Sequence, residues 1–355
     1  MNNEDTHVPS GFYKDSISHF ILIFAYHFLA MFQESVHARV FQNYLEKVNF
    51  PQEPQHLYDP IRYILSLSGK RIRPLLVLMG AELFDESAVE PALPASAAIE
   101  FFHNFSLIHD DIMDVAPLRR GKPTVHQKWN DNVAILSGDA LLIKAYQELA
   151  KCPTDKIPDL LRIFNATSLE VCEGQQYDMD FEKRAQVSET AYIDMIRLKT
   201  SVLLGCALQM GAIIAGADVR SQRSLYDFGV NLGIAFQLQD DILDVYGNPK
   251  SFGKQVGGDI LSNKKTILFV KLQELICPTD QDQLAYLLNQ TIDTEPEKVE
   301  KMMGLYAKYD IHTLAIYQKE KFTTIAYEKL MEIQVEADKK QTLFSLADAL
   351  MHRVQ

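Results

Sequence analysis

The chain has 355 residues, of which 47% are hydrophobic and 23% are charged, and its formal net charge is −12 at pH 7. This composition is typical of a folded globular protein and excludes collagen-like, low-complexity and disordered classes. The acidic balance also argues against a nucleic-acid partner, because proteins that bind nucleic acid need Lys and Arg to replace the counterions of the phosphates.

Residues 1–35 form an N-terminal extension whose role the sequence leaves open. Its apolar stretch, Ile17 to Phe32, is similar to the hydrophobic part of a signal peptide, but the residues before it carry three acidic side chains and only Lys14. A stretch of 16 residues that includes two histidines is also too short for a membrane span. We interpret it as an additional amphipathic helix, or as a leader upstream of a start at Met31, and expect no stable membrane insertion.

From about Val36 onward, apolar residues recur at three- and four-residue steps, which predicts a single all-α domain over residues 36–355. Alternating strand patterns and Asn-Gly hairpins are missing. The clearest predicted helices are Ala95 to Ile112, Val133 to Leu149, Ala191 to Ala215, Leu225 to Val245 and Thr323 to Met351. Gly and Pro gather at Ser68 to Pro74, Pro117 to Pro123 and Gly247 to Gly258, which predicts loops at helix ends.

Cysteine usage indicates a reducing compartment. The four cysteines lie 20 or more residues apart and form no C-x-x-C pair: Cys152, Cys172, Cys206 and Cys277. This spacing argues against a structural zinc site or a disulfide framework, so we expect reduced thiols and a cytoplasmic location.

An acidic motif occurs twice within the predicted helices. Asp110-Asp111-Ile112-Met113-Asp114 recurs 130 residues later as Asp240-Asp241-Ile242-Leu243-Asp244. On a helix, the first and last Asp of D-D-x-x-D lie on one face, one turn apart. Crowded carboxylates repel one another unless a cation lies between them, and Mg²⁺ is held by carboxylate and phosphate oxygens. Two such faces across a helical bundle would bind a diphosphate through Mg²⁺.

The surroundings of the two motifs favour this interpretation over a solvated acidic surface. Both motifs lie in apolar helices, and His103, Ser106 and Gln237 extend their polar faces. Cations that could bind phosphate follow in the neighbouring loops, and one lies in an apolar helix. They are Lys70, Arg71, Arg73, Arg119, Arg120, Lys122, Lys199, Lys254, Lys264 and Lys265.

These motifs together closely resemble those of the trans-isoprenyl diphosphate synthases. The match is ordered and runs from about residue 45 to the end of the chain. It comprises GKRIRP at 69–74, H-x6-DDIMD at 103–114, LRRGKPTVH at 118–126, KT at 199–200, FQLQDDILD at 236–244 and GGDI-x3-KKT at 257–266. The resemblance implies the isoprenoid synthase fold, a bundle of about ten or more helices around a central cavity, and a homodimer.

The resemblance also implies roles for individual residues. Asp110, Asp114 and Asp240 would bind Mg²⁺ most directly, with Asp111, Asp241 and Asp244 in support. The diphosphate of isopentenyl diphosphate would be bound by Lys70, Arg73, His103 and Arg120. The allylic diphosphate would be surrounded by Arg119, Lys199, Gln237, Lys254 and Lys264, with Thr200 near the reacting carbons; Lys199, Thr200 and Gln237 form the catalytic set.

The implied reaction is a Mg²⁺-dependent condensation of isopentenyl diphosphate with dimethylallyl, geranyl or farnesyl diphosphate. The family's usual complement is about three Mg²⁺ per site, with Mn²⁺ able to substitute. In the family, bulky side chains just before the first Asp close the cavity floor; here those positions are Phe105 and Ser106. One bulky and one small residue favour a C20 product, geranylgeranyl diphosphate, over C15 farnesyl diphosphate, with a longer-chain polyprenyl product third.

Two functions of other classes stay open at this point. A cyclising terpene synthase would share the first motif and the cavity, but it normally lacks the second motif and the GKRIRP site. An acidic helical protein that binds Ca²⁺ or a protein partner, without enzymatic activity, is the other alternative.

Overall fold

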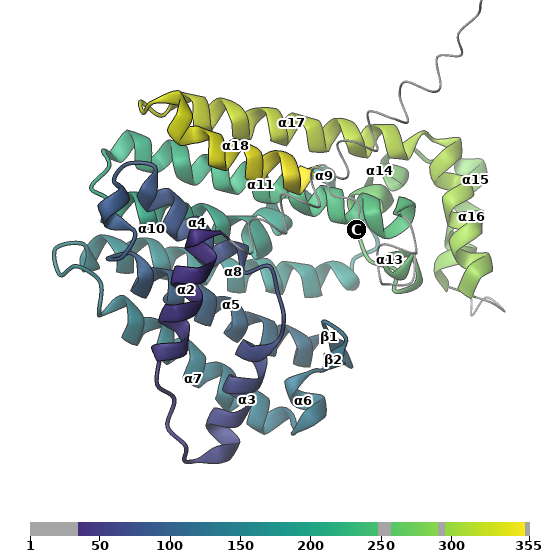
Figure 1. Cartoon of the computed structure of the whole chain (residues 1–355). Helices are drawn as coiled ribbons and strands as arrows, with labels where there is room; N and C mark the ends of the chain where they lie inside the picture. The colour runs from purple at the N-terminus through teal and green to yellow at the C-terminus, as the bar shows by residue number, and fades with distance from the viewer. Residues whose placement is uncertain (1–34, 248–256, 290–294, 352–355) are drawn as a thin grey trace, which may run out of the picture.

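The computed structural model describes residues 35–247, 257–289 and 295–351. Within them the chain is helical almost throughout, which confirms the predicted all-α class (Figure 1). The elements are α2 Val36–Lys47, α3 Gln55–Ser66, α4 Ile72–Glu82, η1 Glu86–Ala88, α5 Leu93–Met113, β1 Leu118–Arg119, β2 Lys122–Pro123, α6 Val125–Lys128, α7 Asp131–Leu149, α8 Ile157–Glu182, α9 Glu189–Ile196, η2 Arg197–Ser201, α10 Val202–Ile214, α11 Val219–Tyr246, α13 Gly258–Leu261, α14 Ile267–Leu275, α15 Pro278–Asn289, α16 Glu295–Lys308, α17 Ile311–Glu332 and α18 Ala337–Met351.

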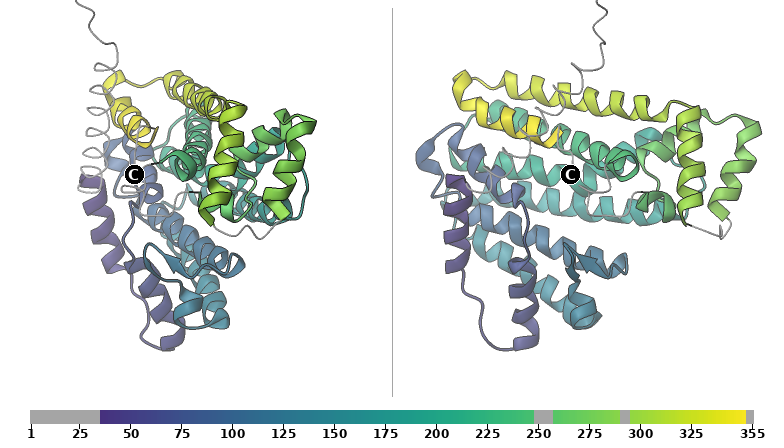
Figure 2. Two further views of the ribbon diagram at one scale, coloured as in Figure 1. Left: turned by 90° about the vertical axis from the view of Figure 1, so that its right-hand side faces the viewer. Right: turned by 45° about the vertical axis from the view of Figure 1, so that its right-hand side comes forward.

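The centre of the bundle is α10, whose sequence is apolar on every side. Almost all of its residues are buried, as expected for a helix without a polar face. It packs on α4 and on α11, and α11 packs in turn on α17. On the other side of the bundle α5 packs on α7, and α15 and α16 stand at one end of the long helices (Figure 2).

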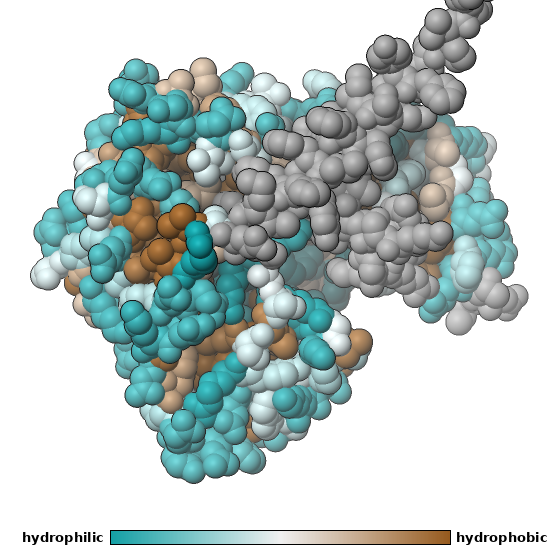
Figure 3. Space-filling view, in the orientation of Figure 1, coloured by the Kyte–Doolittle hydropathy of each residue, from teal (hydrophilic) through white to brown (hydrophobic). Residues whose placement is uncertain are grey.

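Apolar side chains form two clusters, one around α4, α5 and α10 and the other around α9, α14 and α17. The long helix α11 contributes to both clusters, so it connects the two halves of the core. On the face seen in Figure 3 the described surface is mainly hydrophilic, with separate hydrophobic areas.

Two of the predicted helices are interrupted. The predicted helix Thr323 to Met351 is wrong, because α17 ends at Glu332 and α18 begins at Ala337. This break lets α18 fold back against α17 and α11, where it buries Leu343, Leu346 and Leu350. The predicted helix Ala191 to Ala215 is interrupted by the π turn η2, which carries Lys199 and Thr200.

A hairpin that the sequence did not predict follows α5. Leu118 pairs with Pro123 and Arg119 with Lys122. Arg120 and Gly121 between them have φ angles of 53° and 72°, the positive values that a two-residue hairpin turn requires. The hairpin projects Arg119 back toward the end of α5.

One segment, Glu189–Ile214, is long and apolar enough to cross a membrane by length and composition. In the structure 78% of its apolar window is buried among other helices, as expected for the core helix of a globular bundle.

Candidate active site

A cavity of about 540 Å³ lies between α5, α8, η2 and α11. It brings together residues that are up to 167 positions apart in the sequence, from Arg73 to Asp240. The predicted site residues that line it are Arg73, His103, Phe105, Ser106, Asp110, Arg119, Lys199, Thr200, Gln237 and Asp240. Thus one Asp of each acidic motif faces the same space.

Several polar atoms of the cavity wall are buried without a hydrogen-bond partner among the described residues. They are Arg73 Nε, Asp110 Oδ1 and Gln175 Nε2. Buried polar groups in native proteins are normally hydrogen-bonded, so two donors and an acceptor without hydrogen bonds in one cavity indicate a polar ligand. The acceptor, Asp110 Oδ1, has an ion-pair contact with Lys199 Nζ at 3.5 Å. The donors suit the oxygens of an anion, and the Asp110 oxygen suits a cation.

Asp111, the second Asp of the first motif, is held by Arg119. The carboxylate is 1% exposed and receives two parallel hydrogen bonds, from Arg119 Nε at 2.8 Å and from Nη2 at 2.7 Å. Arg119 Nη2 also lies 3.8 Å from Asp110 Oδ2. The bidentate pair therefore fixes the β1–β2 hairpin to α5 and places a guanidinium at the cavity wall.

Lys199 reaches the cavity from the π turn between α9 and α10. Its ammonium lies 2.6 Å from Asp178 Oδ2 and 3.5 Å from Asp110 Oδ1. Burial lowers the pKa of Lys199, but the two carboxylates outweigh burial and raise it, so the side chain stays charged. π turns are rare and are often found at functional sites.

Two glycines allow neighbouring helices to approach this turn closely. A Cβ atom on Gly174 of α8 would lie 2.2 Å from the Lys199 backbone nitrogen. A Cβ atom on Gly233 of α11 would lie 2.7 Å from the Ser201 Cα. Any larger side chain at these positions would push the helices off the turn that carries Lys199.

Sequence reasoning missed Asp178, together with Gln175 and Cys172 on the same helix. The signal was present, because Gln175 and Asp178 are three positions apart and therefore share one face of α8. Acidic and amide residues are frequent in this part of the helix, including Glu173, Asp180 and Glu182, so this pair did not stand out from them.

The second acidic motif is used partly to hold another segment of the chain. Asp241 is 3% exposed and accepts hydrogen bonds from Tyr192 Oη, from Ile267 N at 3.1 Å and from Gln237 Nε2 at 3.3 Å. Burial, and next the charge of Asp259, raise the pKa of Asp241 to about 7. Asp244 Oδ2 accepts from Asp259 N at 3.0 Å.

The other end of the cavity is cationic. Arg73 Nη1 lies 3.2 Å from His103 Nε2, and burial lowers the pKa of Arg73 only to about 10, so it remains charged at neutral pH. Burial, and next the charge of Arg73, lower the pKa of His103 well below its ordinary value. His103 is therefore neutral and accepts the hydrogen bond from Arg73. Glu100, which is 4% exposed, lies one turn before His103, and its negative charge acts on Arg73 and on Arg120.

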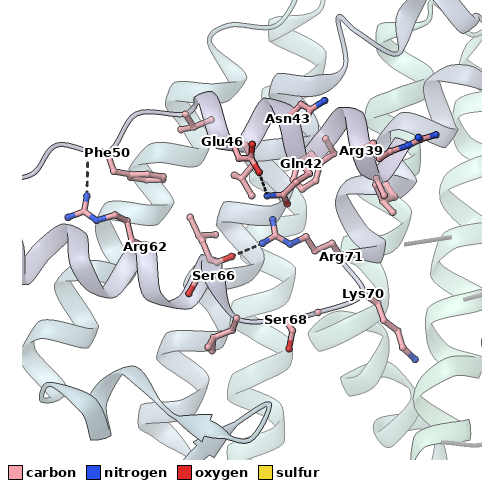
Figure 4. Close-up of a pocket in the computed structure, with 18 of the residues that line it drawn as sticks. Arg39, Gln42, Asn43, Glu46, Phe50, Arg62, Ser66, Ser68, Lys70 and Arg71 are labelled. Carbon is pink, nitrogen blue, oxygen red and sulfur yellow. Dashed lines mark hydrogen bonds between the residues drawn. The ribbon is translucent and has the colours of Figure 1, made fainter. Parts of the chain in front are cut away.

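Not every predicted phosphate-binding residue lines the central cavity. Lys70 lines a second hollow, of about 1050 Å³, between α2, α3 and the loop before α4 (Figure 4). In this hollow Arg71 donates to Leu65 O at 2.6 Å, and Arg62 to Pro51 O at 3.0 Å. Both guanidiniums donate to backbone oxygens, although Arg71 Nη1 is buried without a hydrogen-bond partner among the described residues. The central cavity is the better candidate site, because it is lined by Asp110 and Asp240 of the two acidic motifs and the second hollow is not.

The remaining predicted cations are distributed as follows. Arg120 donates to Leu67 O at 3.2 Å and thus joins the hairpin to the Lys70 loop. Lys264 lies 3.8 Å from Asp259 Oδ1, and the nearby acidic residues raise its pKa despite burial. Lys254 lies outside the described residues.

Aromatic rings line one part of the cavity, which we call its apolar end. Phe105 packs edge-on against His109, with ring centroids 4.7 Å apart, and against Phe102 at 5.6 Å. Phe102 in turn packs on Phe164 at 5.4 Å. Ser106 also lines the cavity, and its hydroxyl donates to His103 O at 2.8 Å. Phe105 and Phe102 both line the cavity, and Phe164 packs behind Phe102.

The carboxylates fit a Mg²⁺ ion that is shared with a substrate. Among the described residues no group of three or more His, Cys, Asp or Glu side chains has metal-binding geometry. Mg²⁺ usually takes one or two carboxylates and completes its shell with waters and phosphate oxygens. Asp110 Oδ1 is buried and unpaired by hydrogen bonds, and burial and the nearby Asp110 raise the pKa of Asp114, as expected where a cation is needed.

Cationic side chains, a carboxylate from each acidic motif and aromatic rings line one cavity of this all-α bundle. This is the arrangement of a prenyltransferase, an enzyme that moves an isoprenoid chain from its diphosphate. The Polyprenyl synthetase family model matches residues 54–307, and the chain belongs to this family. Members of the family use isoprenoid diphosphates and generally depend on Mg²⁺. This family assignment decides against the two alternatives of other classes, a cyclising terpene synthase and a non-enzymatic acidic binding protein.

Named relatives agree with this assignment. The chain is 38% identical over 286 residues to a geranylgeranyl diphosphate synthase of Sulfolobus acidocaldarius. The aligned region covers 79% of this chain and 86% of the relative. It is 39% identical over 234 residues to a geranylfarnesyl diphosphate synthase of Natronomonas pharaonis, covering 61% of this chain and 69% of the relative. A crystal structure of a geranylgeranyl pyrophosphate synthase superposes with a TM-score of 0.83 at 46% identity, covering 90% of this chain and 98% of that one.

Proposed function

We propose that the protein condenses isopentenyl diphosphate with a shorter allylic diphosphate to form the C20 compound geranylgeranyl diphosphate. The observation that carries this proposal is a set of buried polar atoms in one cavity that have no hydrogen-bond partner among the described residues: the donors Arg73 Nε and Gln175 Nε2, and the acceptor Asp110 Oδ1. This arrangement suits a ligand that is itself a complex of an anion with a cation, such as a Mg²⁺ diphosphate.

In the proposed reaction the allylic C–O bond breaks and pyrophosphate leaves. The double bond of isopentenyl diphosphate then attacks the allylic carbocation, a new C–C bond forms, and a proton is lost to the departing pyrophosphate. When bound, Mg²⁺ neutralises the charge that grows on the leaving group. Lys199, Arg119 and Gln237 bind and orient the allylic diphosphate, and they stabilise its developing charge electrostatically.

The second substrate is proposed to bind at the cationic end. Arg73 donates to its diphosphate, and neutral His103 holds the arginine side chain in place. Arg120 and Lys70 belong to the adjoining hairpin and loop. Apolar residues such as Val171 and Leu203 line the space between the two ends, which keeps water from quenching the carbocation.

The C20 length is supported by the floor of the cavity and by the relatives. Phe105 closes the apolar end, while Ser106 beside it leaves room for an isoprenoid chain of intermediate length. The Sulfolobus relative and the superposed crystal structure are both geranylgeranyl diphosphate synthases.

Product analysis tests the function directly. We expect the purified protein with Mg²⁺ to convert isopentenyl diphosphate and dimethylallyl, geranyl or farnesyl diphosphate into a C20 diphosphate, measured by mass spectrometry after removal of the phosphates. Product that stops at C15, or that continues to C30 and beyond, would contradict the proposed length. No condensation with any of the three starters would contradict the function.

We also propose that two copies associate through α7. Leu136 and Ile143 on this helix are 60% and 58% exposed, and because they are seven positions apart they lie on one face. An exposed apolar stripe of this kind is typical of an interface. Sedimentation should give twice the 40.4 kDa mass of the chain, and Leu136→Glu should give the single mass. A wild-type monomer at micromolar concentration would contradict the homodimer.

Three further predictions stay proposals: about three Mg²⁺ per site with Mn²⁺ as a substitute, a single domain over residues 36–355, and a cytoplasmic location. The last is supported by the four cysteines, which are all free thiols.

A further inference from the structure

The segment that carries Lys264 is held at both ends by the second acidic motif. At its start, Gly257 N donates to Asp244 O at 2.7 Å and Asp259 N donates to Asp244 Oδ2 at 3.0 Å. At its end, Ile267 N donates to Asp241 Oδ2 at 3.1 Å. Between these anchors, Lys264 N donates to Asp259 O at 2.9 Å. The position of Lys264 therefore depends on Asp241 and Asp244.

Asp241 replaces the usual cap of helix α14. Thr266 is the N-cap residue of this helix, but its side chain makes no capping hydrogen bond. The first backbone N–H groups of a helix have no partner within the helix. The carboxylate of Asp241 supplies one for Ile267, from a different helix, so the start of α14 is fixed to α11.

Tyr192 also donates a hydrogen bond to the Asp241 carboxylate. Tyr192 lies on α9, is 3% exposed, and its hydroxyl donates to the same Asp241 oxygen that accepts from Ile267 N. The other oxygen accepts from the side-chain amide of Gln237. One hydroxyl group thus fixes a carboxylate that in turn fixes a cavity residue and the segment that carries Lys264.

We propose that Tyr192 is a positioning residue for the transfer reaction, and that through Asp241 it keeps Gln237 and Lys264 in place beside the allylic diphosphate. This inference rests on the proposed function of the cavity. The role of Tyr192 is limited to the allylic side of the cavity. Arg73 and His103, at the cationic end, are held by other elements, and among the described residues neither makes a hydrogen bond to Asp241.

The test is the variant Tyr192→Phe, which removes the hydroxyl and keeps the ring. A hydrogen bond to a charged group is lost, so we expect kcat/KM for the allylic diphosphate to fall roughly tenfold to a hundredfold. The KM for isopentenyl diphosphate should stay within about twofold of the wild-type value, because distant sites behave independently. A general loss of protein stability would change the kinetic constants for both substrates alike.

A matched control exists elsewhere in the chain. Tyr44 of α2 donates to Glu148 Oε2 at 2.7 Å, and Glu148 is 1% exposed, so Tyr44→Phe removes an equivalent bond far from the cavity. It should leave the kinetics of both substrates unchanged. If Tyr192→Phe has the same kinetics as Tyr44→Phe, or raises both KM values equally, the positioning role is wrong.

A double variant shows whether Tyr192 acts through Lys264. Because Tyr192 also positions Gln237, Tyr192→Phe should add less than its full single-variant defect to that of Lys264→Ala, whereas any defect of Tyr44→Phe should simply add to it. Full additivity of Tyr192→Phe with Lys264→Ala would overturn the proposed route. An inactive wild-type protein would instead contradict the proposed function, so the two failures are distinguishable.

Discussion

Replacement of Asp110 by alanine is expected to lower turnover about a thousandfold, because it removes the carboxylate that we propose as a ligand of the Mg²⁺ that stabilises the charge of the leaving group. Asp110 lines the cavity, its Oδ1 is buried without a hydrogen bond among the described residues, and Lys199 lies 3.5 Å from it. The measurement is steady-state turnover at saturating substrates and Mg²⁺.

The fold should survive this substitution. Alanine is the best helix former, and Lys199 keeps its 2.6 Å contact with Asp178. Helical circular dichroism should therefore match the wild type. Asp59→Ala is a suitable control, since Asp59 also pairs with an arginine, Arg62, but lies on α3 away from the cavity. Turnover of Asp110→Ala close to that of the control would exclude the proposed metal site.

The variant Phe105→Ala is expected to shift the main product from C20 to C25. Removal of the ring opens a space of about one isoprene unit at the apolar end of the cavity, since a phenyl group and an isoprene unit are similar in size. Phe102, which lines the cavity beside Phe105, is 1% exposed and packs on Phe164 with ring centroids 5.4 Å apart. Because this ring stays in place, we expect elongation by one unit and not a long-chain product.

The opposite change provides the control for this prediction. Phe105→Trp should shorten the main product to C15 by filling the same space, and Ser106→Ala should leave the distribution unchanged because it removes only a hydroxyl. The measurement is the mass of the dephosphorylated products. An unchanged product distribution in Phe105→Ala would show that Phe105 does not limit product length. Products of C30 or longer would show that Phe102 does not limit it either.

Much of the site was predictable because its residues stand in short motifs on helices. The apolar periodicity of Leu225 to Val245 correctly predicted the helix that carries the second motif. The i, i+4 spacing of Asp110 and Asp114 implied one helix face, but α5 ends at Met113, and Asp114 is its C-cap residue and is not among the residues that line the cavity. Helical periodicity is a local property, so it can be read from a single sequence. The opposition of Asp110 and Asp240 across one cavity followed from the repeat of the motif.

The parts that could not be predicted depend on contacts between distant segments. Tyr192 and Asp241 are 49 positions apart, and nothing in either local pattern indicates that they meet. The placement of Lys70 in the second hollow depends on the path of the loop before α4, and Arg71, with a φ angle of 45°, sets that path. The break before α18 depends on the length of the bundle, which local periodicity does not contain.

The π turn at Arg197–Ser201 has a consequence for protein engineering. Each residue advances an α-helix by about 100°, so the widened turn acts as a phase shift between α9 and α10. Deletion of one residue there would restore a continuous α-helix and rotate either Tyr192 or the whole of α10 away from its neighbours. Loop grafts and chimeras between relatives should therefore keep the number of residues between Tyr192 and Val202 constant, even where every side chain in that interval is exchanged.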